Sequence, residues 1–372
     1  MFAKALTAHE PEHRAILRRT ARDWLDRTRP LSAVRALAGE RRYDRDFLAQ
    51  MGAMGWLGLL ADPEAGLDCA DLVALHRELG RRLLPEPVVA SGVMAASLLG
   101  WAGNPAHAAA LAALCSGEQI ATLAWQGGAG ATTAAQTGPR AEATAEGYRL
   151  DGTAAFVPWA GHADAWIVAA QGAGGIVLGW LPRGTAGVTL VPGTAIDRSE
   201  VSDLRLSDVL LPASAVIAGP DRGADLLDRV LDLGRMAISA ELVGAAEAAF
   251  AMTLDYLRER KQFGRAIGAN QALQFTSVDL FVQIELANSV LSNAARRFDG
   301  PDRARLVAGC KSRCSDIAFE TVKQAIQLHG AIGYTDACDV SLYVKRVMSW
   351  APWLGNGAAQ RARLGAMARQ AA

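Results

Sequence analysis

The sequence predicts a mostly helical protein with a β domain between two helical regions. Apolar residues recur at helical spacing before residue 118, and short alternating runs with glycine turns follow. Long helical patterns return from Gly223 onward. A chain of 372 residues exceeds one average domain. We therefore expect an N-terminal helical domain at 1–118, a β domain at 119–215 and a C-terminal helical domain at 223–372.

The N-terminal region carries three segments with helical periodicity. They are Ala15–Leu25, Tyr43–Gly52 and Leu72–Gly80. The stretch Leu83–Val88 contains two prolines and predicts a stop and a turn before another helix.

The middle region reads as strands. About 100 residues of closely spaced strands favour a small barrel or sandwich. The clearest runs are Tyr148–Gly152, Ala165–Ala170, Gly175–Trp180 and Gly187–Pro192.

The C-terminal region predicts long helices. One runs from Leu226 to Phe263, and two more lie near 272–298 and 303–328. Helices of this length usually need burial against one another, which favours a bundle.

Composition excludes some functional classes. Apolar residues make up 51% and charged residues 20%, with 38 basic and 38 acidic side chains. No basic surplus indicates nucleic acid or an anionic membrane surface as a partner. The first residues lack the apolar core of a signal peptide, and no run of about 18 apolar residues marks a membrane span. We expect a cytoplasmic protein.

The five cysteines predict reduced thiols rather than a metal site. Cys310 and Cys314 share a helix face, but no second pair or nearby histidine completes a zinc site. His162 and Asp164 have no metal-ligand partner at useful spacing, and a role in a turn is expected for them.

Two motifs carry the strongest functional signal. The first is Arg260-Lys-Gln-Phe-Gly264 with Gln271, and the second is Gln327-Leu-His-Gly-Ala-Ile-Gly-Tyr334. At this spacing they resemble the paired signature of the acyl-CoA dehydrogenase flavoproteins. The resemblance covers nearly the whole chain. It implies an N-terminal α domain, a β domain and a C-terminal four-helix bundle that forms the oligomer.

The resemblance also implies FAD and the residues that hold it. In the family both motifs reach across a subunit interface to a neighbour's FAD, and the arginine meets its pyrophosphate. A planar guanidinium suits a diphosphate because it donates two parallel bonds. Taken alone, each motif could be only a helix end stopped by glycine. The cofactor-binding residues expected here are Arg260, Phe263, Gln271, Gln327, Gly330 and Ala331.

Neither family position for the catalytic base carries an acid. Counted without gaps from Gln327, the position of the family's glutamate is Leu354. Other members place that glutamate just before an arginine 25 residues ahead of the first motif. This arginine is Arg235, and Gly234 precedes it. Removal of the proton alpha to a thioester needs a positioned base, which leucine and glycine cannot supply.

The segment expected to meet the flavin also departs from the family. Phe156-Val-Pro158 stands where members carry a hydroxyl residue that bonds flavin N5, and proline lacks even an N–H. Gly127–Thr133 occupies the place of a flavin-covering segment and departs from it almost throughout. A dinucleotide-loop reading of these glycines is not favoured because Gly138-Pro139 breaks the pattern.

Glu241 is a candidate for a displaced base. It lies seven residues after Gly234, on the same helix face and roughly 10 Å along the axis at 1.5 Å per residue. The favoured alternative is a buried carboxylate paired with an arginine or a backbone donor.

These features predict an FAD-binding subunit of an acyl-CoA dehydrogenase. The pattern resembles the non-catalytic subunit of bacterial heteromeric enzymes, which pair two different family subunits. Expected partners are an acyl-CoA thioester, a second family subunit and an electron-transfer flavoprotein as acceptor. Three alternatives stay open: a homomeric enzyme with a relocated base, a flavoprotein with other chemistry on CoA thioesters, and a non-enzymatic interaction protein.

Overall fold

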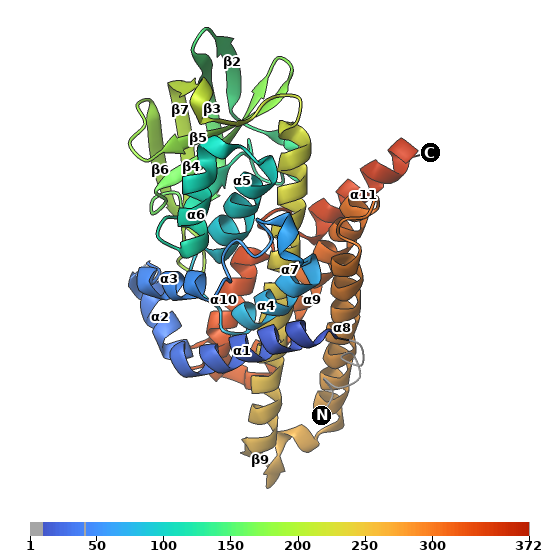
Figure 1. The fold of residues 1–372 in the computed structure, drawn as a ribbon. Coiled ribbons are helices and arrows are strands. Elements are labelled where there is room, and N and C mark those ends of the chain that lie inside the picture. The colour runs from blue at the N-terminus through green and yellow to red at the C-terminus, as the bar shows by residue number, and fades with distance from the viewer. Residues whose placement is uncertain (1–9, 41, 372) are drawn as a thin grey trace.

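The computed structural model describes residues 10–40 and 42–371, and it has the predicted fold class (Figure 1). A helical N-terminal part is followed by a β sheet and then by long helices that run beside both. The absence of a signal peptide was inferred from Met1–Thr7, which lies outside the described residues.

Two helices of the N-terminal part, α3 and α4, begin at aspartate caps. Asp44 accepts from the amide of Phe47, and Asp68 forms a reciprocal capping box with Asp71. After the proline-containing turn the chain re-enters a helix at Val88, as the sequence predicts. The elements are α1 Glu12–Thr28, α2 Leu31–Glu40, α3 Arg45–Ala53, η2 Pro63–Ala65, α4 Cys69–Arg81, η3 Val88–Ala95 (a π-helix), α5 Ala96–Ala102, η4 Pro105–His107 and α6 Ala108–Ser116.

The β part is one connected sheet whose two halves pack face to face. Its order is β6-β7-β3-β2-β4-β5-β8, and β1 pairs in parallel with β4. The halves join through a single pair, Arg140 with Gln171. Buried residues of β3 and β7 share a core with those of β1, β4 and β5, which gives a sandwich-like packing. The elements are β1 Ala121–Ala124, η5 Ala134–Gln136, β2 Arg140–Thr144, β3 Gly147–Pro158, β4 Ala165–Gly172, β5 Gly175–Pro182, β6 Val188–Thr194, β7 Glu200–Pro212, η6 Ala213–Ala215 and β8 Val216–Ala218.

Long helices form the C-terminal part, and α9 packs against α7, α8, α10 and α11. In Figure 1, α7 runs from beside the sheet down to the β9–β10 hairpin, and α8 and α9 run alongside its lower part. The elements are α7 Gly223–Glu259, β9 Lys261–Gln262, β10 Arg265–Ala266, η7 Ile267–Ala269, α8 Gln271–Arg296, α9 Arg303–His329, η8 Gly330–Tyr334, α10 Val340–Trp350 and α11 Gly357–Ala371.

The predicted end of the first long helix was wrong. The helix stops at Glu259 rather than Phe263, because Arg260 adopts an extended conformation with ψ 119°. Phe263 and Gly264 then take φ of 52° and 79° and form the turn of the β9–β10 hairpin. Positive φ is easy for glycine and costly for phenylalanine, so the hairpin turn overrides the apolar period.

α7 is the central helix of the core. Most of its first 24 residues are buried, and α4, α9 and the π-helical segment η3 pack against it. It is the one helix in the described part of the chain with the length and apolarity to cross a membrane. Since 67% of its most apolar window is buried inside the protein, the core position accounts for that composition.

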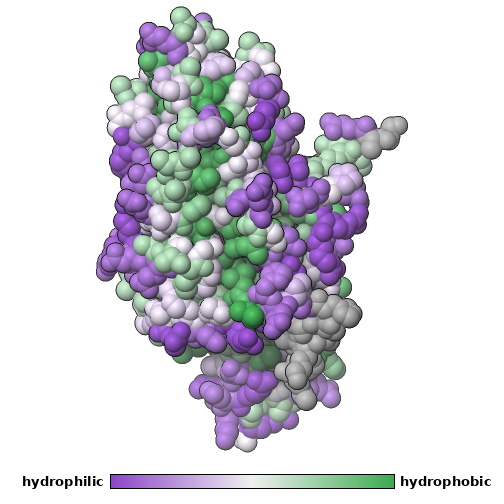
Figure 2. All heavy atoms as spheres, in the orientation of Figure 1, coloured by the Kyte–Doolittle hydropathy of each residue, from purple (hydrophilic) through white to green (hydrophobic). Residues whose placement is uncertain are grey.

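Hydrophilic and hydrophobic residues are interspersed on the surface (Figure 2). On this face hydrophobic residues gather in a band down the middle, with hydrophilic residues along both sides.

Candidate active site

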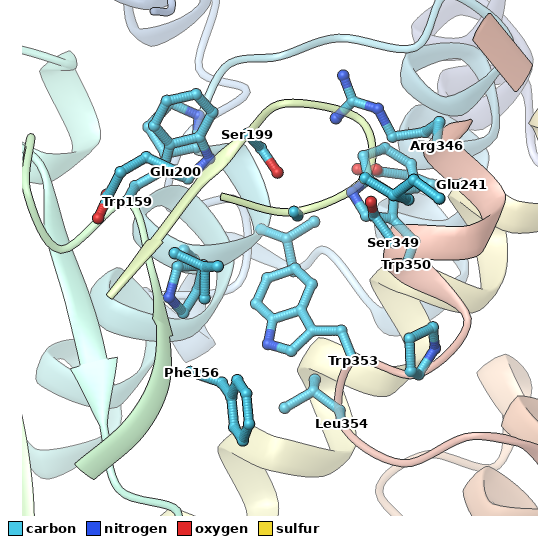
Figure 3. A pocket seen from close by; sticks show the side chains of 18 of the residues that line it. Phe156, Trp159, Ser199, Glu200, Glu241, Arg346, Ser349, Trp350, Trp353 and Leu354 are labelled. Atoms are coloured by element: carbon cyan, nitrogen blue, oxygen red, sulfur yellow. The ribbon is translucent and has the colours of Figure 1, made fainter. Parts of the chain in front are cut away.

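A cavity of about 540 Å³ lies between the sheet and the C-terminal helices. Its walls are mostly apolar and aromatic. Figure 3 shows Trp353 in the middle, with Leu354 and Phe156 below and Glu241 across from Glu200. The segments that line it are Leu84–Ala90, Ala129–Ala131, Phe156 with Pro158 and Trp159, Thr194–Ile196, Ser199–Val201, Arg346, Met348–Trp350 and Pro352–Gly355, together with Leu79, Gln126 and Glu241.

Leu354 and Gly234 meet at the floor of this cavity. Leu354 is 1% exposed. A Cβ built on Gly234 would lie 2.8 Å from Leu354 Cδ1 and 2.7 Å from Met94 Sδ. The two positions identified from the sequence as lacking a base therefore face the same point in space. The leucine side chain fills that point with hydrocarbon, and only glycine leaves room for it.

Arg235 holds the backbone around this floor. Its guanidinium is fully buried and donates to the carbonyls of Leu354 (3.1 Å) and Thr132. It also pairs with Asp232 at 2.8 Å. Burial lowers the pKa of Arg235 to about 10. One side chain thus ties the 351–355 loop to the predicted flavin-covering stretch, Gly127–Thr133.

Asp232 is the counter-ion for a cluster of guanidiniums. Arg363 lies 2.9 Å from it and Arg303 3.2 Å. Burial alone would raise the pKa of this carboxyl, but the charges of Arg235, Arg363 and Arg303 outweigh burial and lower it. A buried cation of this kind is stable only because its partner stays ionised.

Lys311 supports the same loop from the other side, a role that was not predicted from the sequence. Its ammonium donates to the carbonyl of Ala351 (2.7 Å), the carbonyl of Gly355 (3.2 Å) and the hydroxyl of Ser315 (2.9 Å). Burial lowers the pKa of Lys311 to about 7. Leu354, between these anchors, has a φ of 59°, so the loop is held in a conformation that is strained for leucine.

Glu241 lies on the cavity wall and pairs with a histidine. Its Oε1 is 2.7 Å from Nδ1 of His76 on α4, and both side chains are buried. The burial of Glu241 was expected from the sequence. The expected partner, an arginine or a backbone donor, was wrong, because the partner is His76. Burial raises the pKa of Glu241, although His76 acts in the opposite direction.

Two glycines bring His76 to Glu241. A Cβ on Gly80 would lie 2.2 Å from the carbonyl oxygen of Glu241, and one on Gly244 would lie 2.0 Å from that of Arg77. α4 and α7 therefore cross at backbone contact distance, which a larger residue at either position would prevent.

A second buried carboxyl on the cavity wall, Glu86, was not predicted from the sequence. Glu86 is 5% exposed and its Oε1 accepts from Arg29 at 2.7 Å. Burial raises the pKa of Glu86 to about 7, against the charge of Arg29. Its Oε2 is enclosed without a partner in the described part of the chain.

The residues that resemble flavin contacts lie far from this cavity, at the end of the helical bundle. Arg260 is exposed beside the β9–β10 hairpin, and Phe263 at its tip is 99% exposed. Gln271 opens α8 next to it and is also exposed. Figure 1 shows the hairpin projecting beyond the rest of the molecule.

The second motif comes to the same end of the bundle. Tyr256 of α7 stacks on His329 of α9 with ring centroids 4.4 Å apart, which joins the ends of the two helices. Gln327, Gly330 and Ala331 are exposed. The structure therefore brings both motifs together, and none of their residues lines the cavity.

Family models give the chain its identity. The model for the N-terminal domain of acyl-CoA dehydrogenases matches residues 10–118, and that for the C-terminal domain matches residues 221–368. The chain belongs to the acyl-CoA dehydrogenase family.

Individual relatives agree with this assignment. The chain is 28% identical over 344 residues to the probable acyl-CoA dehydrogenase FadE25 of Mycobacterium tuberculosis, covering 84% of this chain and 88% of that protein. It is 30% identical over 207 residues to the short-chain specific acyl-CoA dehydrogenase of Megasphaera elsdenii, where the match spans 54% of the relative.

Two similar solved structures are named for a pair of chains, and one of them is named a complex. The Tcur3481–Tcur3483 steroid acyl-CoA dehydrogenase variant has a TM-score of 0.87 and 28% identity, over 97% of this chain and 98% of that one. The ChsE4–ChsE5 complex from Mycobacterium tuberculosis has a TM-score of 0.84 at 24% identity, over 95% and 96%. The latter likeness shows the fold alone.

The cofactor of acyl-CoA dehydrogenases is FAD, and the exposed motifs fit the part that the family assigns to them. Within the described residues no acid pairs with Arg260, and Phe263 is almost fully exposed despite its strained φ. An unpaired guanidinium can donate hydrogen bonds to a diphosphate. The uncovered aromatic ring beside it can pack against the adenosine of the same cofactor, bound to another subunit. The wall of this chain's own cavity fits a flavin less well, because Pro158 offers no hydrogen-bond donor at the position where the family has a hydroxyl.

The remaining predicted sites form no centre. No group of three or more His, Cys, Asp or Glu in the described ranges could hold a metal ion, and Cys310 and Cys314 are free thiols. After β1 the glycine-rich segment leads into the 3-10 turn η5 rather than a helix. Asp164 accepts a hydrogen bond from the amide of Ile120 and forms an ion pair with Arg45.

Proposed function

We propose that this chain is the FAD-binding subunit of a heteromeric acyl-CoA dehydrogenase and that it lacks the catalytic base. The α,β-desaturation of an acyl-CoA removes an alpha proton and transfers a beta hydride, which FAD accepts when bound. The observation that carries the proposal is the contact of Leu354 with Gly234. A buried hydrocarbon contact cannot accept a proton, so under this proposal the base comes from another chain.

Two further features support the proposal. Pro158 lines the cavity at the position of the family's flavin-bonding hydroxyl. Arg260, Phe263 and Gln271 are exposed and do not line this chain's own cavity, so they are free to serve a neighbour. The solved structures of paired chains, one of them named a steroid enzyme, provide a precedent for the assembly within the family.

The decisive experiment compares the chain alone with the chain co-purified with a second family member that carries a glutamate. The isolated chain should fail to reduce an artificial electron acceptor with any acyl-CoA, since loss of a general base lowers rates by about 10²–10⁴-fold. The complex should be yellow and active. Robust turnover by the purified homomer would refute the subunit assignment.

One alternative enzyme is favoured by a specific observation. Glu241 lines the cavity and carries a raised pKa, so it could act as a relocated base in a homomeric enzyme. In that case Glu241→Gln should abolish turnover with flavin retained. Under the subunit proposal the isolated protein has no turnover to lose.

Other assignments follow from the same proposal. We place the domains at 1–118, 119–215 and 223–372, supported by the change from helices to strands after Ser116 and back at Gly223. We also propose a cytoplasmic location and electron transfer to an electron-transfer flavoprotein.

A further inference from the structure

We propose that the Glu241–His76 pair is a polar anchor for the far end of the ligand in this cavity. The ligand would be an acyl-CoA thioester whose hydrocarbon body carries a hydroxyl group remote from the thioester. The thioester class rests on the proposed function, whereas the hydroxyl comes from the geometry of the pair.

The pair stands out because the surrounding wall is apolar and aromatic. Trp350, Trp353, Leu79 and Val88 line the same cavity. Figure 3 shows Glu241 on the Arg346 side of the cavity and Leu354 on the opposite side. A buried carboxylate in such a place is costly unless a partner satisfies it.

Only one of the two carboxylate oxygens is satisfied by the protein. Oε1 is bonded to His76. Among the described residues no group donates to Oε2. This oxygen is not enclosed by protein atoms, and because Glu241 lines the cavity, Oε2 is open to it. With Glu241 ionised, that oxygen can only accept a hydrogen bond. A ligand hydroxyl is the neutral donor that fits it.

The other charged side chains on the wall have partners within the protein. Arg346 donates to the carbonyls of Leu83 and Leu84 and lies 3.2 Å from Asp197. Glu200 accepts from the amide of Gly161 and the hydroxyl of Ser202. Glu86 accepts from Arg29 through Oε1, and its unpartnered Oε2 is enclosed by protein atoms rather than open to the cavity.

The position of the pair sets the length of the ligand. Glu241 follows Gly234 by seven residues on α7, which is roughly 10 Å along the helix at 1.5 Å per residue. With the thioester end near Leu354, a hydroxyl at the far end of a decanoyl-sized body reaches Glu241. The same distance makes Glu241 a specificity residue rather than a base at the alpha carbon.

The test is a binding measurement on the full-length protein as purified. Decanoyl-CoA and ω-hydroxydecanoyl-CoA are titrated by calorimetry, with tryptophan fluorescence as a second signal because Trp159, Trp350 and Trp353 line the cavity. The hydroxylated probe should bind about tenfold more tightly, as one hydrogen bond to a charged group provides. The ω-carboxy analogue should bind more weakly than either because its charge opposes Glu241.

Variants separate the anchor from the rest of the wall. Replacing both partners, Glu241→Leu with His76→Leu, should bring the two affinities together without leaving an unpaired group. Glu241→Gln is the conservative variant and should reduce the preference in part. Glu200→Gln, on the opposite wall, should preserve it.

Either of two results would overturn the anchor: equal affinity of the wild-type protein for both probes, or an unchanged preference in the double variant. Failure of both probes to bind would also overturn it. None of these results bears on flavin content or on co-purification with a partner, which test the proposed function separately.

Discussion

At the scale of single residues, the floor of the cavity depends on the fit between a glycine and a leucine. Gly234 has no side chain, and Leu354 occupies the space that a side chain would need. This fit predicts a specific energetic coupling between positions 120 residues apart in the chain.

Gly234→Ala should destabilise the protein by about 1–3 kcal/mol, because the new methyl group would overpack against Leu354 and Met94. Gly309→Ala is the matched control. Gly309 lies on α9, another helix of the bundle, and a Cβ added there meets nothing within 4 Å. Denaturant unfolding measures both. Combining Gly234→Ala with Leu354→Val should recover part of the loss, and strict additivity would contradict the contact.

Leu354→Glu should not by itself create an active enzyme. The new carboxylate would be buried beside Met94, and Pro158 would still lack a donor. We expect a lower free energy of unfolding and no turnover comparable to a family enzyme, measured by acceptor reduction with purified protein. Full activity of this variant would show that the missing base is the only defect.

Lys311 predicts a pH dependence of stability. Its pKa is about 7 in the folded protein and 10.5 as the reference for an unfolded chain. Between these values the unfolded chain binds the additional proton, so the free energy of unfolding should rise as pH increases from about 7 to about 9. Below about 7 both states are protonated and this contribution to the slope vanishes.

Lys311→Met should flatten that slope, whereas Lys323→Met on the exposed face of the same helix should leave it unchanged. Chemical denaturation across this pH range measures the slope for each protein. A slope in Lys311→Met as steep as in the wild type would assign the dependence to other groups.

At the scale of secondary-structure elements, the sequence predicted most helices and strands because their periods are long and regular. It failed where a short-range conformation competed with the period, as at Phe263, whose positive φ turns the chain at an apolar position. The contact of Leu354 with Gly234 could be located only through motif spacing. The roles of Lys311, His76 and Glu86 could not be predicted, because each depends on a partner from a distant element.

The β9–β10 hairpin predicts the cofactor contact of a neighbouring subunit. Arg260→Ala should release FAD from the assembled protein, since loss of a charge-assisted hydrogen bond costs about 1.5–3 kcal/mol. Arg258→Ala is the matched control, because that guanidinium is exposed and paired within its own helix with Asp255. Flavin absorbance after gel filtration measures occupancy. Unchanged FAD occupancy in Arg260→Ala would contradict the assignment of Arg260 as a cofactor contact.

At the scale of the whole molecule, the bundle leaves an apolar stripe uncovered. Phe275, Val278, Val282 and Leu286 follow one another at helical spacing on α8 and are 45–65% exposed. Contiguous apolar side chains on a helix face indicate an interface with another protein chain. The stripe starts next to the hairpin that carries Phe263, so an interface here would also cover the predicted flavin contacts.

We therefore expect a dimer or tetramer that assembles through α8. Val282→Glu places a charge in the middle of the stripe and should shift the protein toward monomers in light scattering at micromolar concentration. Ala109→Glu, at an exposed position of α6, controls for the added charge. Because the flavin contacts lie beside the same interface, Val282→Glu should lose FAD together with the partner subunit, while its secondary structure stays intact. A folded wild-type monomer at that concentration would contradict the assembly. Loss of the partner with full retention of FAD would separate the interface from the cofactor site and contradict the role of the hairpin.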